Sequence, residues 1–471
     1  MKNKENTKGK KYPHVLFILF VVLVCATILT WIIPAGNYER VLNEETGKMV
    51  IDASSFQYVD KTPVGPLDMF LAVEEGLIDA ANITFLIFAA FACMYVLEKT
   101  GALDAAISRM VKFTNKNPKY SMAIIAVIMF VLSAWASTGT MSYEEIIAFI
   151  PIFTALCLAL GYDSITALGI SVIPVGMGFA SATLNPFSIG VAQQIAELPL
   201  FSGLKLRVAI LLVMTTFTIV YVLRYATKVK KDPTKSLVYD IDYSDLIMDE
   251  ERMNTPFTIE RKLSILTLFV GIGVMAYGLI RKGWYINEVA SIFMIISLLV
   301  GIINKWSAKK ICDIYVQGLS AGVLSALIVG FARGILMVFS KGNILDTIIF
   351  SFANVLQNLS LYVSGLGMLI FQTLLNFLIP SGSGQAAVSM PIMVPLADLI
   401  GMNRQIAVLI FQFGDGFSNL IWPTGFMIIA CTVARIPLNK YYKFMVPFFA
   451  IGFVIQVIFI FIAISIGYGP F

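Results

Sequence analysis

The sequence predicts an all-α polytopic membrane protein with inverted structural repeats, each containing a re-entrant helical hairpin and a broken transmembrane helix. Three observations lead to this prediction: the composition, the long apolar segments and a pattern that occurs twice. Hydrophobic residues make up 58% of the 471 residues and charged residues only 13%, compared with about 25% charged residues in a typical soluble domain. This balance indicates a chain that is surrounded largely by lipid.

Several apolar windows are long enough to cross a bilayer, for which a helix needs about 20 residues. The first window follows a lysine-rich stretch and has no small-residue cleavage pattern, so we expect a retained helix behind a cytoplasmic tail of residues 1–12 and not a signal peptide. The windows lie near residues 15–34, 81–98, 205–225, 263–280, 286–303, 319–339 and 443–467.

A Gly-x-Gly-Phe pattern occurs at residues 176–179 and again at 414–417, and each copy is followed at the same distance by Ala-x-x-Pro. Unpaired backbone is tolerated within a bilayer only where protein buries it or where it lines a wet cavity, and paired interrupted segments indicate a transporter's substrate site. We therefore predict broken helices over 163–198 and 404–436. The interruptions are Ser181, Thr183, Asn185 and Pro186 in the first copy and Ser418, Asn419, Pro423 and Thr424 in the second.

Two further regions, 119–160 and 359–400, each contain two apolar arms around a small polar tip. Such a tip could be a turn outside the bilayer between two complete spans, but the broken helix just downstream of both favours re-entrant hairpins. The repeat then covers most of 81–199 and 320–437. The tips are Ser137, Thr138, Gly139 and Thr140 in the first hairpin and Ser381, Gly382, Ser383, Gly384 and Gln385 in the second.

Clusters of lysine and arginine predict the orientation, because such clusters favour the cytoplasmic side. With each hairpin returning to its own side, the positive clusters fall inside, the N-terminus is cytoplasmic and the C-terminus is extracytoplasmic, in a bacterial inner membrane. Arg281 and Lys282 are the exception. The predicted parts are a first repeat at 13–226, a cytoplasmic loop at 227–259, a linking span at 260–282, which inverts the next repeat, and a second repeat at 283–471.

Three acidic residues are expected at membrane depth, where ionisable groups are usually functional. Glu144 and Glu145 follow the first tip within one helical turn, and Asp415 lies between the glycines of the second Gly-x-Gly-Phe copy. The alternative for the glutamates is simple capping of a helix N-terminus. Together with Ser181, Thr183, Asn185, Ser418, Asn419, Thr424 and the residues of both tips, the three acids are the candidate substrate-binding residues.

Arg333 is the notable buried cation, and three roles are open to it: pairing with one of these acids, holding a substrate carboxylate, or a structural partnership. Glu74, Glu75 and Asp79, by contrast, lie in an amphipathic stretch that we expect to be a solvated face.

Other functions lack the residues that they need. The single histidine and the five cysteines, which have no ligand-like spacing, predict neither a metal site nor a cofactor. Without a His-bearing motif, a Gly-x-Ser-x-Gly motif or an acidic metal cluster, we do not expect an enzyme. The net charge of +5 comes from residues outside the spans, so it concerns membrane topology and no nucleic-acid partner is expected.

Two motifs carry a family resemblance: Trp-Ile-Ile-Pro-Ala-Gly-Asn-Tyr at residues 31–38 and Met-Ser-Tyr-Glu-Glu at residues 141–145. With the paired hairpins and broken helices, they resemble the basic amino-acid (arginine/ornithine) antiporters, which are related to the C4-dicarboxylate anaerobic carriers of the ion transporter superfamily. The resemblance implies a homodimer in which a transport domain moves against a scaffold by an elevator-like motion. Sodium–dicarboxylate symporters of that superfamily carry Ser-Asn-Thr tips, whereas the two hairpin tips of this chain have no asparagine.

The charges also bear on the substrate. A cationic side chain at the bilayer midplane needs carboxylates beside it, which Glu144, Glu145 and Asp415 would supply, whereas a dicarboxylate would want basic groups and finds only Arg333. The sequence therefore predicts a secondary active transporter that exchanges a basic amino acid by alternating access. A proton- or sodium-coupled C4-dicarboxylate or carboxylate transporter is the alternative, and a channel is less favoured.

Overall fold

The computed structural model describes residues 15–469, except residues 44–47, 53, 117, 140, 244–245, 247–253, 283, 285 and 357–358. The described chain is overwhelmingly helical, which confirms the prediction of a helical polytopic membrane protein. The predicted apolar windows at 15–34 and 263–280 correspond to the helices α1 (Val15–Ile32) and α13 (Ile259–Lys282). Within the described residues, six helices are long and apolar enough to cross a membrane: α3 (Ala81–Lys99), α11 (Leu204–Lys231), α14 (Ile286–Ile303), α15 (Ala308–Lys341), α17 (Leu361–Leu378) and α21 (Leu438–Ser465).

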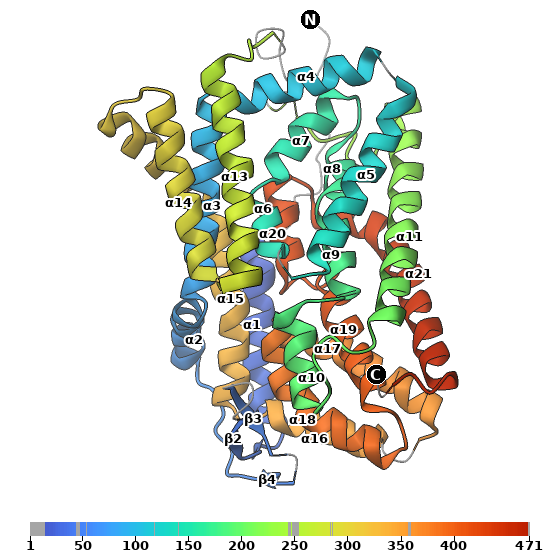
Figure 1. Ribbon diagram of the computed structural model, residues 1–471. Helices are drawn as coiled ribbons and strands as arrows, with labels where there is room; N and C mark the ends of the chain where they lie inside the picture. The colour runs from blue at the N-terminus through green and yellow to red at the C-terminus, as the bar shows by residue number, and fades with distance from the viewer. Residues whose placement is uncertain are drawn as a thin grey trace, which may run out of the picture.

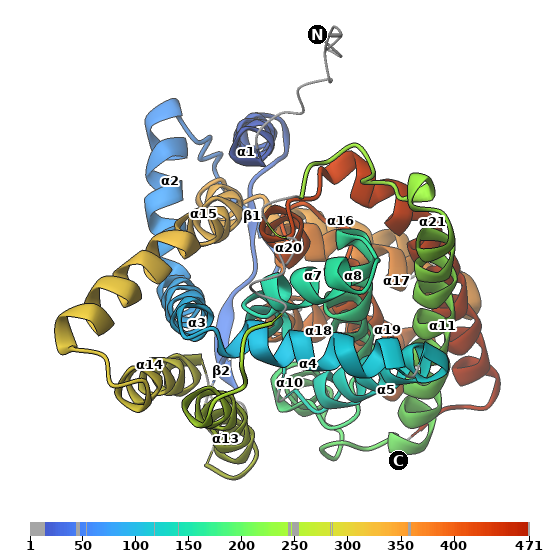
Figure 2. The ribbon, with the colours of Figure 1, turned by 90° about the horizontal axis from the view of Figure 1, so that it is seen from above.

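One group of helices, here called the outer arc, consists of α1, α2 (Pro66–Asp79), α3, α13, α14 and α15, which lie along one side of the molecule in Figure 2. α15 packs along α1, α2 and α3, and α14 packs along α3 and α13. Buried side chains of α3, α13, α14 and α15, such as Leu86, Phe293 and Ile296, form one apolar cluster, which also includes Ala148 of the first hairpin. Other buried residues of α1, α2, α3 and α15 belong to the larger apolar cluster that contains the hairpins. The arc is therefore packed around α13 and α14 on one side and against the hairpins on the other.

The hairpins and broken helices form the second group, here called the inner bundle (Figure 1). The first hairpin is α5 (Pro118–Ala136), returning as α6 (Tyr143–Ile147) and α7 (Ile150–Ala159). The second is α17, returning as α18 (Gly382–Leu399). α11 and α21 pack against this bundle.

Both predicted broken helices are interrupted where the polar residues lie. The first runs through α8 (Ser164–Ile170) and α9 (Val172–Ala180), breaks, and resumes as the π-helix η1 (Pro186–Gly190) and α10 (Val191–Ile195). The second runs through α19 (Arg404–Ser418), breaks, and resumes as α20 (Phe426–Val433).

The first arm of each hairpin packs against the first half of the broken helix that follows it, α5 against α9 and α17 against α19. In Figure 1 the first hairpin lies toward the upper end of the molecule and the second toward the lower end. This placement agrees with inverted repeats, although the inversion and the exact repeat boundaries stay predictions.

Short strands between α1 and α2 depart from the all-α prediction. β1 (Gly36–Asn37) pairs with β4 (Gln57–Tyr58), and β2 (Arg40–Asn43) pairs with β3 (Lys48–Ile51), both antiparallel. This segment lies beyond the spans, where water can satisfy the open edges of such small sheets. Arg40 binds both carboxylate oxygens of Asp346 at 3.0 Å, which fastens the segment to α16 (Leu345–Leu356).

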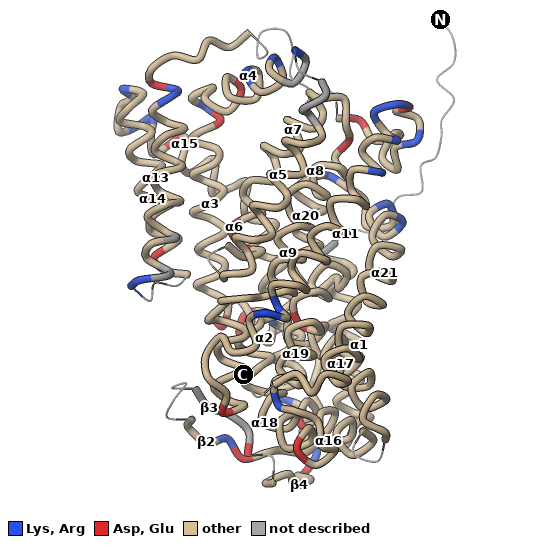
Figure 3. Tube along the Cα trace, turned by 45° about the vertical axis from the view of Figure 1, so that its right-hand side comes forward, with Lys and Arg blue, Asp and Glu red and all other residues tan. Residues whose placement is uncertain are grey.

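Charged residues gather toward the two ends of the molecule, and the middle is largely uncharged (Figure 3). Large apolar side chains on the outer faces of α13, α14 and α21 are exposed, among them Phe269, Leu298 and Val454. A band of this kind matches the hydrocarbon layer of a bilayer. α4 (Ala102–Lys116) and α16 lie across opposite ends of the molecule in Figure 1.

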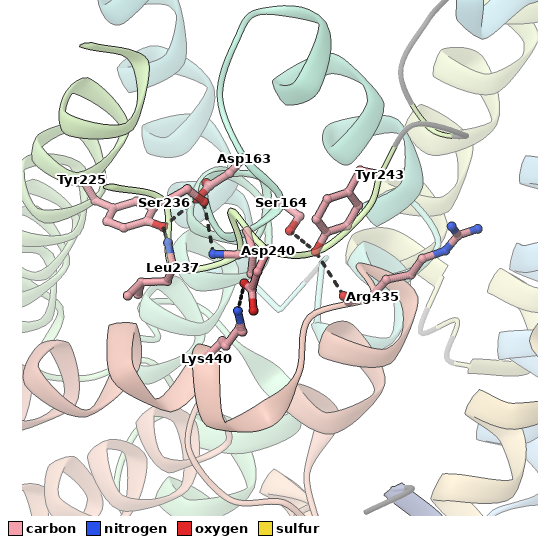
Figure 4. Close-up of polar contacts among 10 residues, drawn as sticks. Asp163, Ser164, Tyr225, Ser236, Leu237, Asp240, Tyr243, Arg435 and Lys440 are labelled. Atoms are coloured by element: carbon pink, nitrogen blue, oxygen red, sulfur yellow. Dashed lines mark hydrogen bonds and ion pairs between the residues drawn. The ribbon is translucent and has the colours of Figure 1, made fainter. Parts of the chain in front are cut away.

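The segment 232–243, here called the brace, leaves α11 and returns across the ends of both broken helices (Figure 4). Asp163, which caps α8, accepts hydrogen bonds from the hydroxyls of Tyr225 and Ser236, each at 2.6 Å. The hydroxyl of Tyr243 accepts from Ser164 at 2.7 Å and donates to the carbonyl of Arg435 at 3.1 Å. The brace thus joins α8, where the first broken helix begins, to the turn between α20 and α21, where the second one ends.

Candidate functional site

A cavity of about 340 Å³ lies between the outer arc and the inner bundle, where the two hairpin tips approach the breaks. Its volume falls within the range of about 300–1,000 Å³ that is usual for small-molecule sites. The cavity is lined by Asp79, Asn82, Ile83, Gly139, Ser142, Tyr143, Glu144, Glu145, Phe179, Phe187, Ile286, Val289, Arg333, Pro380, Ser381, Gly382, Ser383, Gly384, Asn419 and Phe426.

The first tip is fastened to the first break. The carbonyl of Ser137 accepts the backbone N–H of Thr183 at 2.8 Å, and the two hydroxyls lie 3.0 Å apart. Gly139 has a φ of +75°, and a Cβ there would come within 2.6 Å of Oδ1 of Asn185. Because of both the backbone angle and the close side chain, only glycine fits this turn without strain.

The second tip closes against both broken helices. α18 begins at Gly382, and a Cβ on this glycine would lie 3.1 Å from Oδ2 of Asp415 and 3.1 Å from Cβ of Ser188. Gln385 donates to Gln372 of the first arm at 2.7 Å, which holds the two arms together. Because they lack a Cβ, Gly139 and Gly382 let the tips approach the broken helices closely.

Glu144 and Glu145 both line the cavity, but their bonding differs. Glu145 Oε2 accepts the backbone N–H of Ser142 at 2.8 Å, and the side chain of Ser142 accepts the backbone N–H of Glu145, which together form a capping box. The hydroxyl of Ser142 has one proton and lies within hydrogen-bond distance of both carboxylates, 2.6 Å from Oε2 of Glu145 and close to Oε2 of Glu144. No other side chain in the described part of the molecule donates to Glu144. The capping role that the sequence left open thus describes Glu145, and Glu144 is the more available carboxylate.

Arg333 of α15 enters the cavity wall from the outer arc, and its guanidinium lies 3.6 Å from the carboxylate of Asp79 on α2. Glu75 of α2 pairs with Lys341 of α15 at 2.7 Å. The side chains of Asp79 and Glu75 are 45% and 42% exposed, as expected for a solvated face, but both also pair with basic residues of α15. The stretch lies along α15, and its neighbours across that contact are basic.

The structure brings Gly139, Glu144, Glu145, the second-tip residues 381–384, Asn419 and Arg333 to one cavity. The remaining candidates hold the framework around it or lie behind it. Thr140 is outside the described residues. Three hold neighbouring segments together or cap a helix: Ser137 and Thr183 join the first tip to the first break, and Asn185 caps η1. Gln385 joins the arms of the second hairpin. Thr138, Ser418 and Thr424 form hydrogen bonds to the backbone carbonyls of Trp135, Gly414 and Phe377, and Ser181 and Asp415 are buried.

Several lining residues were missed from the sequence. Asp79 and Asn82 come from the α2–α3 junction, and Tyr143 stacks on Phe426 with ring centroids 5.5 Å apart and an interplanar angle of 4°. The only signal for Tyr143 was its place between Ser142 and Glu144, while nothing local distinguishes Asp79 from other surface acids.

The cavity is suited to a small polar ligand with a positive charge. Three carboxylates, those of Asp79, Glu144 and Glu145, face one guanidinium, that of Arg333. The aromatic rings of Tyr143, Phe179, Phe187 and Phe426 supply apolar walls, as is common in small-molecule sites.

A second cavity, of about 470 Å³, lies along the same boundary nearer to α4. It is lined from the outer arc by Glu98 and Ser325 and from the inner bundle by Pro151, Thr432 and Arg435. The boundary between the two groups of helices is therefore hollow at more than one level.

Comparison with known proteins gives two full-length relatives. A protein of Escherichia coli (strain K12), provisionally named a basic amino acid antiporter, YfcC, is 31% identical over 93% of both chains. An uncharacterized protein of Haemophilus influenzae (strain ATCC 51907 / DSM 11121 / KW20 / Rd) is 30% identical over 95% of this chain and 96% of its own.

Two solved transporters align at TM-scores below 0.5. The YdaH transporter of Alcanivorax borkumensis has a TM-score of 0.46 and 15% identity over 97% of this chain and 100% of its own. MtrF of Neisseria gonorrhoeae has a TM-score of 0.42 and 16% identity over 97% and 96%.

The family model described as the C4-dicarboxylate anaerobic carrier, DcuC, matches residues 12–465, which is nearly the whole chain. The 31% identity to the Escherichia coli relative confirms the resemblance to the basic amino-acid antiporter family. On this match and on its full-length relatives, the chain belongs to the C4-dicarboxylate anaerobic carrier (DcuC) family of membrane transporters.

Proposed function

We propose that this protein is a secondary active transporter that exchanges basic amino acids across a bacterial inner membrane by alternating access. The observation that carries the proposal is the charge of the central cavity, in which three carboxylates face a single guanidinium. A cationic side chain taken out of water needs such partners, because an unpaired charge in a low-dielectric site costs several kcal/mol.

The ligand's two ends would meet different parts of the cavity. Glu144, the more available of the two glutamates, would receive the cationic side chain. The α-carboxylate would meet the start of α18 at Gly382, where the first backbone N–H groups of a helix are unpaired and the helix dipole favours an anion. Arg333 remains beside Asp79 as a second carboxylate partner.

A C4-dicarboxylate is the second candidate, because the family description names that substrate and Arg333 lines the cavity. Two carboxylates would require two cationic or dipolar partners, and the α18 start with Arg333 would have to provide both. The three acids of the cavity would then repel the ligand, so we place this candidate second.

The movement that we propose carries the inner bundle, with both tips and breaks, past the outer arc. Both cavities follow the boundary between the two groups, which leaves part of the contact between them open. A homodimer formed through the outer arc would hold that part still.

Exchange in proteoliposomes tests the substrate. Vesicles loaded with arginine, ornithine, lysine, a neutral amino acid or a C4-dicarboxylate would be assayed for uptake of labelled arginine. We expect uptake only against a basic amino acid on the opposite side. Uptake driven by an internal dicarboxylate, or an uncoupled flux without any internal substrate, would contradict the proposal.

A further inference from the structure

Asp415 lies behind the second tip, fully buried and outside the cavity lining. Among the described residues, neither of its carboxylate oxygens has a hydrogen-bond partner. An ionised carboxylate in such a place would lose its hydration with nothing to replace it, a state that buried carboxyl groups avoid by neutralisation. Its burial therefore needs either a proton or another positive charge.

The buried polar side chains around Asp415 include oxygens without a hydrogen-bond donor. The amide nitrogens of Asn376 and Asn419 each donate to the backbone carbonyl of Asp415, and their side-chain oxygens have no partner in the described chain. The hydroxyl of Ser188, whose Cβ also lies beside Gly382, has no partner among the described residues either. The nitrogen of Gln412 is bound to the carbonyl of Phe179 at 2.7 Å, and that of Gln385 is bound to Gln372. The side-chain oxygens of both glutamines are likewise unpartnered.

Protonation decides whether this burial adds a charge. A carboxylate would add a negative charge and two acceptors beside the unpaired oxygens of Asn376 and Asn419. A protonated carboxyl is neutral and brings one O–H donor for such an oxygen. We propose that Asp415 binds a proton and that movement of the second tip controls the exchange of this proton with water.

Few other titratable groups face Asp415. Tyr143 and Glu144 of α6 interact electrostatically with Asp415, and the hydroxyl of Tyr143 donates to the carbonyl of Gly416 at 2.9 Å. α9, α10 and η1 carry no acidic, basic or tyrosine residue. The others on elements packed against α19 are Tyr362 of α17, Asp398 of α18, and Lys440, Tyr441, Tyr442 and Lys443 of α21.

The cover over Asp415 is thin. Gly382, the first residue of α18, lies directly against its carboxylate, since a Cβ there would be 3.1 Å from Oδ2. If the tip moves away from α19, water reaches the carboxyl group and accepts the proton; when the tip closes, the group must be protonated again. This couples the closed tip to one bound proton.

Infrared difference spectra between acidic and alkaline protein test the proton directly and need no substrate. We expect a carbonyl band of a protonated carboxyl group that disappears at alkaline pH, is absent in Asp415→Asn, and persists in Glu144→Gln and in the control Asp398→Asn. A band unchanged in Asp415→Asn, or lost only in Glu144→Gln, would overturn the proposal.

Two further measurements complete this test. If Asp415→Asn fails to fold, Asp415→Glu keeps a proton site and should shift the pH midpoint of the band; an unshifted midpoint would count against Asp415. A sodium-dependent thermal shift of the wild type that is lost in Asp415→Asn would mean a metal cation and overturn the proton assignment.

The coupling role rests on the proposed exchange function, so it is measured separately from the infrared band. The exchange rate of the wild type should vary with pH, whereas Asp415→Asn should exchange with a flat pH profile. A wild-type profile in that variant would refute coupling, while failure of basic amino acids to exchange at all would refute only the proposed substrate.

Discussion

Replacing Glu144 by glutamine tests the cation-binding role of the cavity most directly. Glutamine keeps the size of the side chain and deletes its charge, and the carboxylate has few other bonds to lose, since Ser142 is its side-chain partner. A charge-assisted hydrogen bond contributes about 1.5–3 kcal/mol. The dissociation constant for arginine should therefore rise roughly 10- to 150-fold.

Glu145→Gln is the matched control. Glu145 accepts the backbone N–H of Ser142 at 2.8 Å, and the side-chain oxygen of glutamine can accept the same bond in the capping box. We expect unchanged thermal stability and a smaller loss of arginine affinity. Calorimetry on both purified variants, with a neutral amino acid as a second ligand, would measure the difference.

Two results would refute this reasoning. The first is wild-type arginine affinity in Glu144→Gln, which would leave the cation without its proposed partner. The second is an equal loss for arginine and for the neutral amino acid, which would indicate general damage to the cavity.

The remaining predictions concern the first tip, the brace and the topology. Gly139→Ala should lower the free energy of unfolding by about 1–3 kcal/mol because its backbone is left-handed, and by more because the new Cβ meets Asn185. The Tm of this variant should therefore fall below that of the control Gly161→Ala, where φ is +78° but no atom lies within 4 Å of the new Cβ. Equal Tm values would show that the contact with Asn185 does not constrain position 139. Tyr243→Phe loses its donor to Arg435 and should lower the Tm without changing arginine affinity, and altered affinity with an unchanged Tm would contradict a bracing role. The hydrogen bond from Lys440 lowers the pKa of Asp240. This pair therefore stabilises the fold at pH values above the usual aspartate pKa, and its contribution is lost as the pH falls through the lowered pKa. Lys440→Met should abolish this pH dependence in a series of Tm measurements. In a cysteine-free background, single cysteines at Lys235 and Asp60 should label from the cytoplasm and from outside, respectively, and labelling of position 235 from outside would overturn the predicted orientation.

Burial also affects the tyrosine of the brace. It raises the pKa of Tyr243 to about 12, so this hydroxyl keeps its proton and remains a donor to Arg435 throughout the neutral range. The pH dependence of the brace should therefore come from Asp240 and not from Tyr243.

The sequence alone determined the helical membrane class, the hairpins and the breaks, because these depend on local features. A run of about 20 apolar residues needs a helix in lipid whatever its neighbours are. Proline and small polar residues within such a run interrupt it, as at Asn185 and Pro186, where α9 has ended and η1 begins. The glycine of the first tip, Gly139, likewise meets a local need, because its backbone is left-handed.

Tertiary structure decided which polar residues share a cavity and which hold the framework. Glu144 and Glu145 are adjacent, have the same charge and both line the cavity, yet only Glu145 completes the capping box of α6. Asp79 joins them only because α2 lies along α15, and Asp415 is kept from the cavity only because Gly382 covers it. Hydrophobic periodicity records which side of a helix is apolar, but not which distant helix meets it, so these pairings depend on how the outer arc and the inner bundle pack.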